Sequence, residues 1–419
     1  MPGKTRNKTF TTRREPFFHD HNIHLLPDTV KGPLSFFNPT SARFRIKKSA
    51  QKDWKPTAAE AEPGADVFLP GTEIQWRSRD NRKGRHALVI DPEKQKGGAA
   101  PTATFRAILG GLRRMATEYP YWDVSWLVAV FFTIGCLIFI ACGLFSWLPL
   151  VAPSSKFRGE DIASDVTAFV GATLFQIGAV LLVFEACNEN QTGCFGWALY
   201  EAFHHNADSG SSSDLEGNIV GSTQPGDKMM VAHEDVHKCK HHHQRVRLGE
   251  PLRRPQPGRR WSWWPSWEEF RTHYVHEIGF LGSAAMAVGA TIFYISGICS
   301  LPGIYSNMTL GEARGIYWLT YLVGGIFFIV SSALYLLETQ PNWYTPAPHL
   351  LGWHIGLWNM IGSVGWTLAA ALGYCTKSWC AYQSELTLTW ASVAFTIGSA
   401  LLWYEALDKY PVEQPGNKC

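Results

Sequence analysis

The chain has 419 residues, a formal net charge of +3 and nine cysteines. That charge is too small to predict nucleic-acid binding, and the scattered cysteines are not typical of a secreted disulfide-rich domain. The mean hydropathy of −0.08 averages two different populations, because polar, basic and proline-rich stretches alternate with long apolar runs.

Residues 1–118 are polar and basic, with proline at intervals, and we expect a largely disordered cytoplasmic N-terminal region that offers a surface for protein partners. Two stretches inside it, FFHDHNIHLLPDTV and PLSFFNPTSARFRI, mix aromatic and aliphatic residues with basic ones. We expect them either on a membrane surface or packed beneath the helices that follow. An unstructured tail is the alternative.

Six apolar runs reach the roughly 20 residues that a helix needs to cross a bilayer core of about 30 Å. They cover residues 125–148, 166–185, 278–298, 316–337, 355–375 and 388–405. The sequence therefore predicts an all-α integral membrane protein, a bundle of six transmembrane helices whose main partner is the lipid bilayer. It predicts no oligomeric state.

Three of these runs repeat one pattern that ends in a glutamate: Glu185, Glu338 and Glu405. A leucine lies four residues before each glutamate, a phenylalanine ten before and a small residue fourteen before. Each pattern also follows a helix with two glycines eight residues apart. Such repetition predicts three helical hairpins, at residues 119–190, 266–342 and 343–411. A polar, His-rich cytoplasmic loop (191–265) separates the first two hairpins, and residues 412–419 form a C-terminal tail.

The basic segments before the first span and between the second and third predict that both termini are cytoplasmic. The sequon at Asn307 then lies in an outward loop and is a predicted glycosylation site. A second sequon, at Asn190, contradicts this topology. Cys375 and Cys380 flank another outward loop and are candidates for a disulfide, with Cys299 as a competing partner. The pattern does not distinguish the plasma membrane from an endomembrane.

The repeated glutamates are predicted to have a structural role. Each is at the C-terminal end of a helix, where the macrodipole disfavours a carboxylate. We expect Glu185, Glu338 and Glu405 to cap or pair with the starts of neighbouring spans, near His273, His276 and His354. A solvated charge at the membrane interface is the alternative.

The tract HEDVHKCKHHH in the long loop is the clearest chemical signal. His233, His237, Cys239 and His241 are borderline-soft ligands at short spacing, and they are suited to zinc or copper. The tract also contains the letters H-E-x-x-H of a metalloprotease helix, but no apolar periodicity surrounds them. An unstructured loop is the alternative, and the sequence indicates no other cofactor.

Residues 262–411 resemble a family of fungal multi-pass membrane proteins of unassigned function. The strings that carry this resemblance are ETQ-x-x-WY-x-PAP and WYE-x-LDKYP. The single repeat, with its F-x-[IV]-[GS]-[AS]-x-L pattern, is also similar to the two-helix YrhK-like domain of bacteria. Neither resemblance implies an activity or a catalytic residue.

The spans carry no ionisable residue at mid-membrane, which disfavours proton or ion transport. We therefore expect a non-enzymatic membrane scaffold or regulator. The alternative is a transporter or channel for a small neutral solute, and a membrane enzyme is the least favoured reading.

Overall fold

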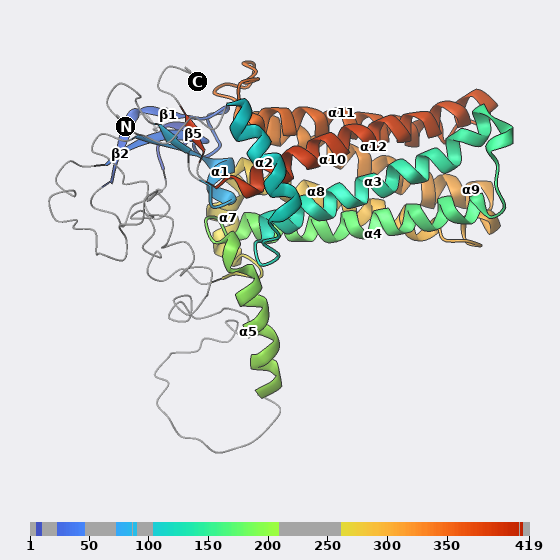
Figure 1. Cartoon of the computed structure of the whole chain (residues 1–419), viewed down its shortest axis with the longest axis horizontal. Coiled ribbons are helices and arrows are strands. Elements are labelled where there is room, and N and C mark those ends of the chain that lie inside the picture. The colour runs from blue at the N-terminus through green and yellow to red at the C-terminus, as the bar shows by residue number, and fades with distance from the viewer. Residues whose placement is uncertain are drawn as a thin grey trace.

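The computed structural model describes residues 6–10, 23–46, 73–85, 87–89, 104–208, 261–409 and 411–413. Within them, six helices are long and apolar enough to cross a membrane. They are α3 (Val124–Val151), α4 (Glu160–Cys187), α8 (Ile278–Cys299), Leu310–Thr339, α11 (Leu351–Leu372) and α12 (Ser378–Leu407). The fourth comprises α9 (Leu310–Glu312), a π-helical turn (Ala313–Trp318) and α10 (Leu319–Thr339). The predicted all-α membrane bundle is confirmed (Figure 1).

The six spans pack as a closed ring, in which each helix contacts the next in chain order and α12 contacts α3. Glycine permits the close approach of the backbones. A Cβ at Gly324 would lie 2.9 Å from the carbonyl oxygen of Gly289, and one at Gly135 would lie 3.4 Å from that of Gly171. The interpretation of the three hairpins as an internal repeat stays a prediction.

Aromatic rings fill the centre of this ring of helices. Trp366 of α11 is fully buried and contacts a phenylalanine from each of the other five spans, at centroid distances of 4.7–6.0 Å. Those five are Phe139, Phe175, Phe293, Phe328 and Phe395. Three of them, Phe175, Phe328 and Phe395, are the phenylalanines of the repeated pattern. The sequence pattern thus places one ring per glutamate-bearing helix in a shared core.

A five-stranded sheet lies beyond one end of the bundle (Figure 1). Its strands, in spatial order, are β1 (Ile23–Lys31), β2 (Ser41–Ile46), β3 (Glu73–Arg77), β4 (Ala87–Val89) and β5 (Val412–Glu413). All neighbours are antiparallel except β4 and β5, which are parallel. Alternation along β2 and β3 buries Ala42, Phe44, Ile74 and Trp76 on one face.

Where the structure describes residues 1–118, the sheet corrects the expectation of disorder. The end of each aromatic stretch forms a strand, β1 and β2 respectively. The loop after β1 packs against the bundle, where the Asn38 amide donates to the carbonyl of His276 (2.9 Å). The strands form because a hydrophobic face that pairs with its neighbours can be buried even in a basic sequence. The C-terminal tail is also ordered in part, since Val412–Glu413 form β5.

Three shorter helices accompany the bundle at the same end. These are α2 (Phe105–Thr117), α5 (Phe195–Asp208) and α7 (Trp267–Thr272). Helix α2 packs its Gly111 against Tyr404 of α12 and exposes Phe105, Leu109 and Leu112. Helix α5 extends away from the bundle within the loop expected to be polar (Figure 1). An amphipathic helix with exposed apolar residues, such as α2, is typical of a membrane interface.

Candidate functional site: a buried ion cluster

The three repeated glutamates meet at the end of the bundle that carries the sheet, which we call the glutamate end. Glu185, Glu338 and Glu405 are 0%, 3% and 1% exposed, so none of them is a solvated interfacial charge. Each lies within two residues of the C-terminus of its helix, α4, α10 or α12. Three buried carboxylates at three negative helix ends require nearby cations.

The cations come from residues 78–85, which we call the cationic segment. It consists of α1 (Ser78–Arg82) and the turn after it, and it brings Arg79, Arg82, Lys83 and Arg85 beneath the bundle. Gly84 has a positive φ of 60°. The Gly84 amide donates to Asn81 (3.1 Å) and the Arg85 amide to Asp80 (2.8 Å), the two bonds of a Schellman motif. This turn directs Arg85 back toward the other cations.

Two of the arginines bind a glutamate with both ends of the guanidinium group. Arg79 donates to Glu405 from Nη2 (2.8 Å) and from Nε (3.3 Å). Arg82 donates to both oxygens of Glu338, with Nη2 at 3.0 Å from Oε2, and its guanidinium group lies 5.5 Å from the Tyr335 ring centroid. Bidentate pairs of this kind are the strongest charge-assisted contacts available to a carboxylate.

The remaining cations join the glutamates into one cluster. Lys83 Nζ lies 3.7 Å from a carboxylate oxygen of Glu185 and 3.7 Å from one of Glu405. Arg85 lies 3.1 Å from Asp80 and 3.5 Å from Glu405. Four cations thus face four carboxylates in a buried volume, and the sheet and three spans are held together by charge.

Burial disfavours the charged form of every cation in this cluster. It lowers the pKa of Lys83 below its ordinary value even though two carboxylates lie nearby. Burial acts in the same direction on Arg79, but the hydrogen-bonded Glu405 outweighs it and the pKa of Arg79 is raised. The cluster is therefore stable only while its members remain paired, because an unpaired charge here is costly.

Two glycines make room for the cationic segment. A Cβ at Gly279, in the first turn of α8, would overlap Arg82 Nη1. A Cβ at Gly352, in the first turn of α11, would lie 2.7 Å from Arg79 Cδ. The two arginine side chains fit beside these helices only because glycine has no side chain there.

A cavity of about 40 Å³ separates the cluster from the aromatic core. Its lining includes Arg82, Lys83 and Glu185 of the cluster, and Phe175 and Phe395 of the aromatic core. Three atoms here have no hydrogen-bond partner among the described residues: both carboxylate oxygens of Glu185 and the Nε of Arg82. The cavity has room for about two or three water molecules, which could satisfy these atoms.

The histidines expected to partner the glutamates do not do so. His354 Nε2 lies 2.7 Å from the Pro348 carbonyl oxygen, and His273 Nε2 lies 3.8 Å from Glu189. The expectation was wrong about the histidines, because the cationic segment supplies the positive charge. Glu338 does lie against the start of a neighbouring span, since a Cβ at Gly279 in the first turn of α8 would be 2.5 Å from its Oε1. The predicted metal ligands His233, His237, Cys239 and His241 lie outside the described residues.

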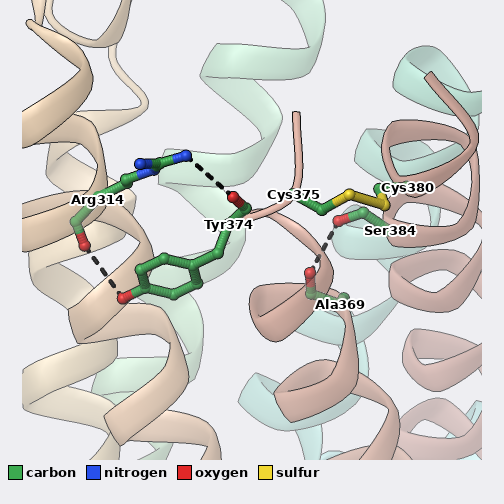
Figure 2. The surroundings of a disulfide bond; sticks show 6 residues. All are labelled: Arg314, Ala369, Tyr374, Cys375, Cys380 and Ser384. Carbon is green, nitrogen blue, oxygen red and sulfur yellow. Dashed lines mark hydrogen bonds between the residues drawn. A yellow bond between two sulfur atoms is a disulfide. The ribbon is translucent and has the colours of Figure 1, made fainter. Parts of the chain in front are cut away.

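The opposite end of the bundle contains the predicted disulfide, between Cys375 and Cys380 (Figure 2). Cys299, the competing candidate, is a free buried thiol. Beside the disulfide, the Tyr374 hydroxyl donates to the Arg314 carbonyl (3.1 Å), and Arg314 Nη2 donates to the Tyr374 carbonyl (3.3 Å). These bonds join the loop after α11 to the π-helical turn.

The two sequons differ in their surroundings. Asn307 is exposed at the disulfide end, in the turn Tyr305–Asn307. Asn190 lies at the glutamate end, and the hydroxyl of its sequon threonine, Thr192, is buried and donates to the Lys83 carbonyl (3.2 Å). In the sequon that contradicts the predicted topology, the threonine hydroxyl is therefore already used in a buried contact within the fold.

Sequence reasoning missed the cationic segment entirely. The letters SRDNRKGR contain a signal, since four cations surround an Asp and a helix-ending glycine in eight residues. That signal indicates a capped turn, but it does not say which carboxylates the cations reach. No family model, curated protein or solved structure matches the chain. The function therefore has to be argued from this geometry.

Proposed function

We propose that this protein is a non-enzymatic membrane scaffold or regulator, in which the sheet domain is held on the bundle by the buried ion cluster. The observation that carries the proposal is the set of bidentate pairs Arg79–Glu405 and Arg82–Glu338. They connect the sheet to two spans directly, and Lys83 extends the connection to α4. A partner bound to the sheet would thus be coupled to the membrane domain.

The same pairs give the docked sheet a switch-like character. Withdrawal of the cationic segment would leave Glu185, Glu338 and Glu405 buried without cations, which is costly. A partly withdrawn cationic segment would therefore be unstable relative to both end states, and the sheet is either docked or released. A two-state element of this kind is what a regulator requires.

We also infer that the glutamate end faces the cytoplasm. Arg113 and Arg114 of α2 lie near the bundle at this end, in agreement with the positive-inside rule. The disulfide and the exposed Asn307 lie at the other end, where an oxidising compartment and glycosylation are both expected. Glycosidase treatment should shift the mobility of the wild type and of Asn190→Gln, but not that of Asn307→Gln. A shift that depends on Asn190 instead would reverse the inferred orientation.

The alternative, a transporter or channel for a small neutral solute, requires a path through the bundle. The small cavity beside Glu185 would be a vestibule of such a path. The aromatic core borders that cavity through Phe175 and Phe395, and the cationic segment borders it through Arg82 and Lys83. Transport would require both borders to open.

Two measurements on the full-length protein test the proposal. In proteoliposomes, we expect trapped neutral solutes to be released no faster than from protein-free vesicles loaded with the same solutes. In cells, proximity labelling should detect different neighbours for wild type and for a released form, Glu338→Gln/Glu405→Gln, whereas the exposed control Glu268→Gln should match wild type. Saturable solute flux together with unchanged neighbours would overturn the proposal in favour of a transporter.

A further inference from the structure

A second group of ionisable side chains lies next to the ion cluster. Glu189 follows α4, His273 ends α7, and Glu277 immediately precedes α8. One ligand atom from each lies within 4.8 Å of the others, and His273 Nε2 is 3.8 Å from Glu189 Oε1. Ligands of a tetrahedral zinc ion are separated by about 3.4 Å, so small side-chain rotations would bring these atoms to bonding positions.

The polar atoms of this group are incompletely satisfied. His273 is 8% exposed, and among the described residues neither of its ring nitrogens has a hydrogen-bond partner. Asn38, also 8% exposed, donates from Nδ2 to Glu277 Oε2 (3.0 Å), while its Oδ1 is buried and accepts no hydrogen bond from the described residues. Buried imidazole and amide groups without partners are costly unless a ligand satisfies them.

Other contacts hold the carboxylates in place. Ser78 Oγ lies 2.7 Å from Glu277 Oε1, and Asn81 donates from Nδ2 to Glu189 Oε2 (3.2 Å). The second oxygen of Glu189 faces His273. A cavity of about 30 Å³ lies against Asn38, Glu189 and Glu277. Secondary hydrogen bonds to ligating carboxylates, together with a small adjacent space, are typical of a metal site.

We propose that Glu189, His273 and Glu277, with Asn38 Oδ1 as the fourth ligand, bind one divalent transition-metal ion. One imidazole and three oxygen ligands suit Zn²⁺, Mn²⁺ or Fe²⁺, and the absence of sulfur from this group disfavours Cu⁺. The ion joins the loop after β1 to the end of α4 and the start of α8. It thus fixes the sheet to the bundle at a place separate from the arginine–glutamate pairs.

The test must separate this site from the His-rich tract, whose residues are also metal ligands. We would use the full-length chain with His233, His237, Cys239, His241, His242 and His243 changed to alanine, here called the tract-free protein. After treatment with a chelator, it would be loaded with Zn²⁺ or Mn²⁺, desalted and measured by elemental mass spectrometry. His273→Ala and Glu189→Gln remove one ligand each, and His349→Ala removes an exposed histidine as the control.

The tract-free protein and His349→Ala are expected to retain one equivalent of metal and to melt at a higher temperature when metal is added. His273→Ala and Glu189→Gln should bind at least about tenfold more weakly and lose that shift. X-ray absorption of the zinc form should show only nitrogen and oxygen neighbours, at about 2.0–2.2 Å.

Each contrary result overturns the proposal. It fails if the tract-free protein binds no metal, if both ligand variants bind as the control does, or if the absorption spectrum requires a sulfur ligand. Glu189→Gln is nearly isosteric, so it keeps the test valid if His273→Ala does not fold. The melting temperatures measured with chelator show whether each variant is folded before metal is added.

Discussion

At the scale of single residues, the buried pair formed by Arg82 and Glu338 is where we expect substitution to be most costly. Glu338→Gln keeps the size of the side chain but leaves Arg82 buried with Glu185, at 3.9 Å, as its one remaining carboxylate partner among the described residues. We expect the free energy of unfolding to fall by about 3–5 kcal/mol. The measurement is thermal unfolding of the purified protein in detergent, with the exposed Glu268→Gln changing stability by no more than about 0.5 kcal/mol.

A double substitution separates charge from packing at this pair. Arg82→Met/Glu338→Met removes both charges together, so it should recover much of the stability that Glu338→Gln loses. If the double variant is less stable than Glu338→Gln, the cost does not come from an unpaired charge. The interpretation of the cluster as a set of mutually dependent ions would then be wrong.

The sequence predicted that the three glutamates need partners, but it identified the wrong ones. Their position at helix ends follows from the apolar pattern, and the need for compensation follows from the helix dipole. Arg82 and Glu338 are 256 positions apart in the chain, and Arg79 and Glu405 are 326 apart. No local pattern relates residues so distant, so only the folded arrangement can pair them.

At the scale of elements, the docking of the cationic segment on α8 depends on Gly279. A small residue in a membrane helix usually reflects helix packing, but this glycine faces Arg82. In Gly279→Ala the new methyl group would displace Arg82 from Glu338, and we expect a loss of about 1–3 kcal/mol. Hydrogen exchange of residues 78–85 should become faster, while exchange in α3 should change little.

Gly311→Ala is the matched control for this experiment. Gly311 is also helical and near the start of a span, but a Cβ there would have no atom within 4 Å. This substitution should leave exchange in the cationic segment unchanged. Equal protection of residues 78–85 in both variants would mean that Arg82 can be accommodated elsewhere.

The predictability of the elements differs between the bundle and the sheet. The six helices follow from uninterrupted apolar runs, which have few alternatives in a chain of this length. Arginine lies on one face of β2, and two of the strands, β4 and β5, have only three and two residues. Strand β5 pairs with β4 across more than 300 residues, and neither strand is long enough to show a reliable alternation. The sheet therefore depends on tertiary pairing rather than on local propensity.

At the scale of the whole molecule, the ring of six spans is closed around one side chain. Trp366 contacts rings from the other five spans, and its Nε1 donates to Ser392 (3.1 Å). Such a residue connects all three predicted hairpins in a single core. The glutamate cluster makes a second set of connections between α4, α10 and α12, so the spans are joined at the centre and at one end.

Trp366→Ala should therefore destabilise the whole bundle and not one hairpin. The substitution removes the side chain that all six spans share, and we expect the free energy of unfolding to fall by about 3–5 kcal/mol. The unfolding transition should move to lower temperature as a single step. It would be followed both by the ultraviolet absorbance of the aromatic side chains and by the circular dichroism of the helices. Trp379→Ala, at an exposed position near the start of α12, should change stability by no more than about 0.5 kcal/mol. Two separate transitions in Trp366→Ala would show that the hairpins can unfold independently. The aromatic core around Trp366 would then be a contact between hairpins that are stable by themselves.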